Sequence, residues 1–124
     1  MRDLQFETKQ FQGVEVVSLS GAVEPMAFTD LAASLGRLIH EATPCLVLEC
    51  RRVTYIGSVQ LKELLDFARY ARTRGGDIKC CCLSPAIRDV AALVGNGESL
   101  ECYDDLLSAV SAFRTETEQA TTPQ

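Results

Sequence analysis

The fold is decided by the stretch Cys45-Leu46-Val47-Leu48-Glu49-Cys50-Arg51-Arg52-Val53-Thr54-Tyr55-Ile56-Gly57-Ser58, followed by Val59-Gln60-Leu61-Lys62-Glu63-Leu64-Leu65. Its apolar first part predicts a buried strand, and the leucine spacing after Ser58 predicts a helix. Ser58 stands at the turn into this helix, beside unpaired backbone N–H groups and the positive end of the helix dipole. A serine at such a place is commonly a structural cap, but an added phosphate would also be stabilised there. The sequence therefore leaves two interpretations of Ser58 open.

Strands and helices alternate on both sides of this stretch. The expected order is strands Leu4–Gln10 and Val14–Ser20, a loop Gly21–Pro25, a helix Phe28–Ile39, strand Cys45–Cys50, a helix from Ser58 that Gly75-Gly76 ends, strand Ile78–Leu83, helix Pro85–Val94, strand Ser99–Tyr103 and helix Leu106–Phe113. The first two strands suit a hairpin, and the later alternation implies right-handed crossovers. The order predicts an α/β fold, with a mixed, mostly parallel five-stranded sheet and four helices. We expect one domain over residues 1–113 and a disordered tail at 114–124, which holds no large apolar residue.

The charge and hydropathy pattern excludes several classes of function. The chain has 124 residues and a formal net charge of -5, with no basic run. An acidic chain of this kind is unsuited to binding nucleic acid or an anionic membrane. No apolar run approaches the roughly 20 residues that span a bilayer, and the first residues hold no apolar signal core. We therefore expect a cytoplasmic protein that does not insert into membranes.

The six cysteines do not form a recognisable framework. Cys80, Cys81 and Cys82 are consecutive, so on a strand their side chains point to alternating faces. The sequence contains no C-x-x-C pair and a single histidine, which disfavours a structural metal site. We expect the cysteines to be small buried apolar residues in a reducing compartment. A redox-sensing role is the alternative.

The strand ends of a parallel sheet are where functional sites gather. The predicted ends are Ser20-Gly21, Ile56-Gly57-Ser58 and Leu83-Ser84-Pro85, and each carries a serine. Ser58 lacks the flanking glycines of a nucleophile elbow. The only histidine, His40, falls at the far end of the first helix, roughly 15–20 Å from this edge. No phosphate-binding glycine motif is present. We expect no catalytic residue, no cofactor and no enzymatic activity.

The chain resembles the STAS domain of bacterial anti-sigma factor antagonists, which regulate transcription, from about Val14 to Phe113. The order and spacing of several segments carry the resemblance. They are Val17-Ser18-Leu19-Ser20-Gly21, the stretch Cys45–Ser58, Leu64-Leu65, Gly75-Gly76-Asp77-Ile78-Lys79 and Leu83-Ser84-Pro85-Ala86-Ile87. The resemblance implies a single STAS-like domain.

In that family, Asp-Ser-Ser-Gly or Asp-Ser-Thr-Gly precedes the second helix. A partner kinase that is also the anti-sigma factor phosphorylates the first serine, and the phosphate breaks the complex. The resemblance places Ser58 on this serine. Gly57 replaces the aspartate, Val59 the second hydroxyl residue and Gln60 the glycine.

The resemblance thus implies a regulator that binds a serine kinase/anti-sigma factor, with binding controlled by phosphorylation of Ser58. The implied contacts are Ser20, Gly21, Gly57, Ser58, Val59 and Gln60. The alternative is a STAS scaffold or accessory subunit of a signalling complex or transport system that never becomes phosphorylated, in which Ser58 is only a cap. An enzyme or nucleotide-binding domain is the third and weakest hypothesis.

Overall fold

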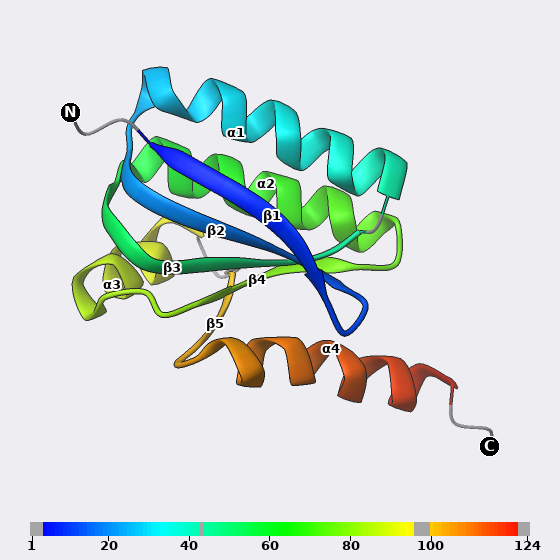
Figure 1. The fold of residues 1–124 in the computed structure, drawn as a ribbon. Helices are drawn as coiled ribbons and strands as arrows, with labels where there is room; N and C mark the ends of the chain where they lie inside the picture. The colour runs from blue at the N-terminus through cyan, green and yellow to red at the C-terminus, as the bar shows by residue number, and fades with distance from the viewer. Residues whose placement is uncertain (1–3, 43, 96–99, 122–124) are drawn as a thin grey trace.

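Five strands form one sheet whose strand order follows the chain (Figure 1). The structure is a computed structural model, and it describes residues 4–42, 44–95 and 100–121. The first two strands pair antiparallel and every later pair is parallel. The strands are β1 (Gln5–Phe11), β2 (Val14–Val23), β3 (Cys45–Ile56), β4 (Asp77–Cys81) and β5 (Glu101–Tyr103). The prediction of a mixed, mostly parallel sheet is confirmed.

Four helices cover the two faces of the sheet, as the sequence predicts. They are α1 (Pro25–Arg37), which continues into the π-helical turn η1 (Leu38–Ala42), α2 (Ser58–Thr73), α3 (Pro85–Val94) and α4 (Leu106–Thr121). Figure 1 shows α1 and α2 side by side over one face and α4 across the other. Within the described residues, no helix is both long and apolar enough to cross a membrane.

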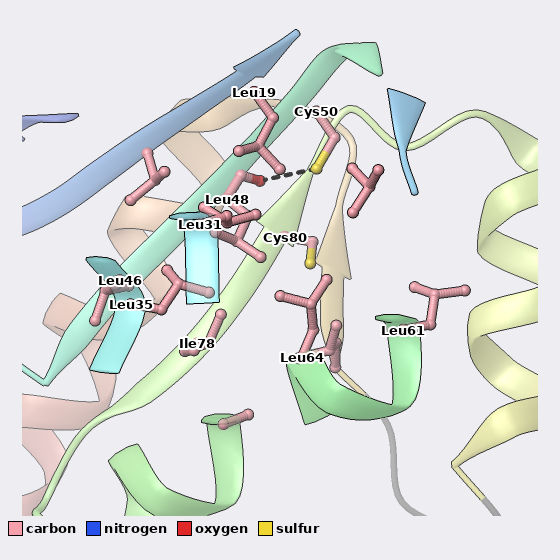
Figure 2. Packing of buried hydrophobic residues seen from close by; sticks show 14 of the residues in the cluster. Leu19, Leu31, Leu35, Leu46, Leu48, Cys50, Leu61, Leu64, Ile78 and Cys80 are labelled. Atoms are coloured by element: carbon pink, nitrogen blue, oxygen red, sulfur yellow. Dashed lines mark hydrogen bonds between the residues drawn. The ribbon is translucent and has the colours of Figure 1, made fainter. Parts of the chain in front are cut away.

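The larger core lies between the sheet and helices α1 and α2. Leucines of the strands and of both helices belong to it, among them Leu48 of β3, Leu31 of α1 and Leu64 of α2 (Figure 2). The same figure shows the Cys50 thiol donating to the Leu48 carbonyl oxygen at 3.5 Å. A smaller core under α4 contains Val47, Val110 and Phe113. Because Leu48 and Val47 are neighbours on β3, the two cores are the two faces of one pleated strand.

Strands β2 and β3 are both longer than the sequence predicts. The expected loop Gly21–Pro25 is wrong for its first part, because β2 continues in register with β3 as far as Val23. Two irregularities in the pairing, between Ser18 and Ser20 and between Gly21 and Ala22, absorb the bend of the strand. Gly21 has a φ of 103°, a left-handed conformation that favours glycine. The glycine that suggested a loop therefore lies opposite a bulge, whose extra residue is on β3.

The C-terminal region also differs from the prediction. Helix α4 continues to Thr121, eight residues beyond Phe113 (121 − 113), so the backbone of part of the predicted tail is helical. Glutamate, glutamine and arginine favour helices without needing burial. The fifth strand begins at Glu101, and the expected start at Ser99 lies outside the described residues. The domain boundary at residue 113 and the disorder of 114–124 remain predictions.

A fully buried lysine, Lys79, lies on β4 under α4. Its Nζ donates to Glu101 Oε1 at 2.6 Å and to Asp77 Oδ2 at 3.4 Å. Nζ also lies 4.7 Å from the centre of the Phe113 ring, which is a cation–π contact. Asp77 in turn accepts from Arg72 Nε at 2.8 Å. The smaller core is therefore organised around a paired charge, which the sequence analysis did not anticipate.

None of the six cysteines forms a disulfide. The prediction of buried side chains is confirmed for Cys50, Cys80 and Cys81, and the other three are half-buried. Cys80 and Cys102 are register partners on adjacent strands. A hydrogen bond with Cys80, together with burial, raises the pKa of the Cys102 thiol, and burial raises the pKa of Cys81. These thiols are protonated at neutral pH, which lowers their reactivity.

Candidate functional site

Ser58 is the first residue of α2, and its side chain is exposed. Gly57 is the N-cap, and its carbonyl oxygen accepts the first helical hydrogen bond from Leu61 N at 2.9 Å. No side chain caps the helix. The interpretation of Ser58 as a structural cap is therefore wrong, because a cap must precede the helix to reach its N–H groups.

Ser84 shows what a capping serine looks like in this fold. It precedes α3, and its Oγ accepts a hydrogen bond from Ile87 N at 3.4 Å. The proline that follows occupies the first turn of α3, as the sequence predicts. Ser84 has a structural bond that explains its presence, whereas the hydroxyl of Ser58 has none in the described structure.

The start of α2 is anchored to the end of β2. Gly57 N donates to the Val23 carbonyl oxygen at 3.2 Å, which joins the last residue of β2 to the N-cap of α2. Helix α1 begins two residues after Val23. The site therefore lies where β2 and β3 end and α1 and α2 begin, at the edge of the sheet that the sequence predicts (Figure 1).

Gly57 and Gln60 fit against each other. Gly57 has φ −67° and ψ 150°, which any residue can adopt, so its conformation does not require glycine. A Cβ at this position would overlap Gln60 Oε1, the end of a flexible side chain, so a larger residue here would have to move the glutamine. Gln60 is only 4% exposed. The glutamine side chain therefore folds back over the N-cap and fills the space that a side chain at residue 57 would need.

Ser20 and Gly21 lie apart from this cluster. They pair with Arg52 and Val53 inside the sheet instead of ending the strand. Ser20 precedes Val23 by three residues, which is about 10 Å along a strand. Ser20 lines an open depression of about 580 Å³ between β1, β2 and β3. Of the predicted contact residues, the structure brings together only those from Gly57 to Gln60.

Exposed apolar side chains lie at the same edge of the sheet as Ser58. Val59, the next residue, is 63% exposed, and Tyr55 at the end of β3 is 52% exposed. Met26, in the first turn of α1, is 90% exposed. Large apolar side chains gathered at one edge are typical of a contact surface for another protein. Val59 is among the contact residues that the sequence predicts, whereas Tyr55 and Met26 are not, because no local pattern shows that their side chains are exposed.

The histidine is remote from the site. His40 Nδ1 lies 3.3 Å from the Tyr70 hydroxyl, near the other end of α2. Tyr70 is twelve residues after Ser58, which is about 18 Å along a helix. The predicted separation of His40 from Ser58 is confirmed. Among the described residues, no group of three or more His, Cys, Asp or Glu side chains could hold a metal ion.

Comparison with known proteins agrees with this architecture. The chain is 26% identical over 106 residues to BtrV of Bordetella bronchiseptica, which is assigned as an anti-sigma factor antagonist, and the match covers 86% of this chain and 91% of BtrV. The crystal structure of an anti-sigma factor antagonist from Mycobacterium paratuberculosis has 26% identity and a TM-score of 0.80, covering 91% of this chain and 96% of that one.

The fold is also that of SpoIIAA, an anti-sigma factor antagonist. Its unphosphorylated form superposes with a TM-score of 0.75 at 18% identity, over 90% of this chain and 97% of SpoIIAA. The phosphorylated Bacillus form gives a TM-score of 0.69 at 18% identity, over 87% and 98% of the two chains. Residues 7–108 match the family described as Mlab, STAS domain. This chain therefore belongs to the STAS domain family.

Proposed function

We propose that this protein is an anti-sigma factor antagonist-like regulator that binds a serine kinase/anti-sigma factor, and that phosphorylation of Ser58 controls the binding. The observation that carries the proposal is the exposed Ser58 hydroxyl at the first position of an uncapped helix. The relationship to BtrV and to the mycobacterial protein supports the general antagonist function.

The physical basis of the switch is that the helix end accommodates the charge of a phosphate, whereas the apolar surface around it, once covered by a partner, does not. A phosphate adds about −1.5 to −2 charge, which the N–H groups at the start of α2 accommodate. A partner docked over Val59, Tyr55 and Met26 would desolvate the same place. Burying a dianion without a matching cation is costly. Phosphorylation at Ser58 therefore disfavours the complex while leaving the fold intact.

The contact surface that we propose is centred on Gly57, Ser58, Val59 and Gln60. Ser20 and Gly21 can take part only if the partner also reaches into the depression on the sheet, because they lie inside β2. The exposed face of α2 continues the surface away from Ser58, with an ion pair between Arg69 and Asp66 at 2.7 Å.

A second function, a STAS scaffold that is never phosphorylated, is favoured by one observation. Gln60 fills the space beside Gly57, so no carboxylate could stand at residue 57 without displacing it. A kinase that required this carboxylate would not recognise the site. The apolar surface around Val59 would then bind a partner permanently.

The experiment is phosphorylation by a serine kinase of the anti-sigma factor class. The protein, the kinase and ATP are incubated together, and the modified residue is mapped by mass spectrometry. We expect one phosphate at Ser58, none in Ser58→Ala and full incorporation in Ser84→Ala, the matched control with an exposed serine at the same sheet edge. Calorimetry with the kinase then compares both forms.

The outcomes separate the two functions. Loss of kinase binding after modification of Ser58 supports the switch. Equal phosphate uptake by Ser58→Ala contradicts it. Tight binding without any phosphorylation would favour the scaffold.

A further inference from the structure

Gln60 carries a polar side chain that is almost completely buried. Only 4% of the residue is exposed, yet its amide makes no hydrogen bond to the described part of the chain. No fully buried side-chain nitrogen or oxygen in the described residues lacks a partner, so the amide retains a narrow contact with solvent. A side chain this deeply buried usually makes its hydrogen bonds within the protein, which the amide of Gln60 does with no described residue.

The position of Gln60 in the helix shows why its amide is unused. As the third residue of α2, it folds back over the N-cap as the glutamine of a capping box does. In a capping box, this side chain accepts from the N–H of the N-cap residue. Here the N–H of Gly57 already donates to Val23. The amide of Gln60 therefore lies at the helix end, but the N–H group that it would usually bond already has an acceptor in Val23.

The same helix end has free donors. The first helical bond is donated by Leu61 N, so the N–H groups of Ser58, Val59 and Gln60 have no helical acceptor. A phosphoryl group on Ser58 would lie against these groups. The amide of Gln60 lies at the same helix end, because its Oε1 occupies the place where a Cβ of the N-cap residue Gly57 would stand. Rotation about the last side-chain bond exchanges Oε1 for Nε2 without changing the shape of the amide.

We propose that Gln60 receives the phosphoryl group of phosphorylated Ser58, with Nε2 donating a hydrogen bond to a phosphate oxygen. The inference rests on the proposed phosphorylation of Ser58 and adds the residue that binds the product. Gly57 takes part by leaving the space in which the amide lies. The phosphate is then held against the helix end instead of moving freely, and the bond replaces the missing partner of Gln60.

The test installs phosphoserine at residue 58 by an expanded genetic code, so it does not depend on any kinase. Phosphorus NMR follows the second ionisation of the phosphate with pH. We expect its pKa to be about half a unit lower in the protein with Gln60 than in Gln60→Met, because a donor favours the dianion. Gln60→Glu should raise the pKa above that of Gln60→Met, since a second negative charge opposes ionisation.

The other charged or titratable groups near the phosphate need a control. Lys62 lies one turn after Ser58, Glu24 is the N-cap of α1 and Tyr55 is the last residue but one of β3. Lys62→Met should raise the pKa of the phosphate by the same amount in the protein with Gln60 and in Gln60→Met. The comparison separates the Coulombic effect of Lys62 from the hydrogen bond of Gln60. In the unmodified protein, millimolar inorganic phosphate should leave the Gln60 side-chain amide NMR signals unmoved.

Equal phosphate pKa values in the Gln60 and Gln60→Met proteins would overturn the inference, as would unmoved Gln60 amide signals on phosphorylation. Saturable movement of these signals by inorganic phosphate would instead indicate a site for free anions and would also overturn it. Failure of the kinase to modify Ser58 would refute only the proposed function. The two failures are thus distinguishable.

Discussion

Replacing Lys79 tests how the second face of the sheet is held together. Lys79→Met keeps the length of the side chain and removes the charge, whereas Lys79→Ala removes both. The lysine is fully buried, with Nζ 2.6 Å from Glu101 and 4.7 Å from the Phe113 ring. The two variants therefore separate the packing of the side chain from its charge.

The contacts of the two carboxylates set the expected magnitudes. Asp77 keeps Arg72 at 2.8 Å, and Glu101 is half exposed and keeps the Tyr103 hydroxyl at 2.9 Å. Neither carboxylate is left alone, so Lys79→Met should lower the free energy of unfolding by no more than about 1.5 kcal/mol. Lys79→Ala adds a cavity beneath α4 and should lower it by about 3–5 kcal/mol.

The assay is urea unfolding at neutral pH, followed by far-UV circular dichroism because the chain has no tryptophan. Lys62→Met, which removes an exposed lysine from α2, is the control and should change the free energy by less than about 0.5 kcal/mol. If Lys79→Met were as destabilised as Lys79→Ala, the charge and not the packing would dominate. A loss below about 1 kcal/mol in Lys79→Ala would show that the side chain is not packed as described.

Three further predictions concern groups with defined bonds. The hydrogen bond from Lys79 lowers the pKa of the Glu101 carboxyl below its usual 4.5, so the stability that this carboxylate contributes is present above that pH and is lost as the pH falls. The unfolding free energy of Glu101→Gln should therefore depend less on pH than that of the unaltered protein between about pH 5 and 3. The same pH profile in both proteins would contradict this. In urea unfolding, Ser58→Ala should change the free energy of unfolding by less than about 0.5 kcal/mol, whereas Ser84→Ala should lower it by about 1 kcal/mol. A larger loss in Ser58→Ala than in Ser84→Ala would refute the assignment of Ser84 as the capping serine. Because its pKa is raised, Cys102 should react slowly with iodoacetamide at pH 8 and rapidly in urea, as mapped by mass spectrometry, and fast labelling of the native protein would contradict its environment.

Local patterns were sufficient to predict the elements of the fold. The apolar run Cys45–Cys50 is a strand buried on both faces, and the leucine spacing after Ser58 is a helix with one buried side. The residues at which strands end were harder to predict, because the continuation of β2 depends on hydrogen bonds to β3 that no local pattern reveals. Gly21 favoured a loop by its residue type, whereas in the structure it continues β2 opposite a bulge of β3.

The candidate site was predicted in place but not in detail. Ser58 lies at the expected sheet edge, yet its role as a cap failed because a one-residue shift in the helix start decides which residue caps it. The relationship between Gly57 and Gln60 is a contact across one helical turn, and only coordinates show that the glutamine folds backwards. Lys79 had a detectable signal, a lysine inside an apolar strand, but its partner Glu101 depends on the register of two distant segments.

The sequential order of the strands has a consequence for synthesis. Each strand pairs with the one that the ribosome delivered just before it, so no early segment must wait for a distant partner. Short separations between paired segments lower the entropy lost on closing each loop and favour rapid folding. Helix α4 follows all five strands, and until it emerges the apolar side chains of Val47 and Cys81 face the surroundings of the nascent chain. The growing chain can thus assemble its sheet in the order of translation, while protection of the second face waits for the final helix.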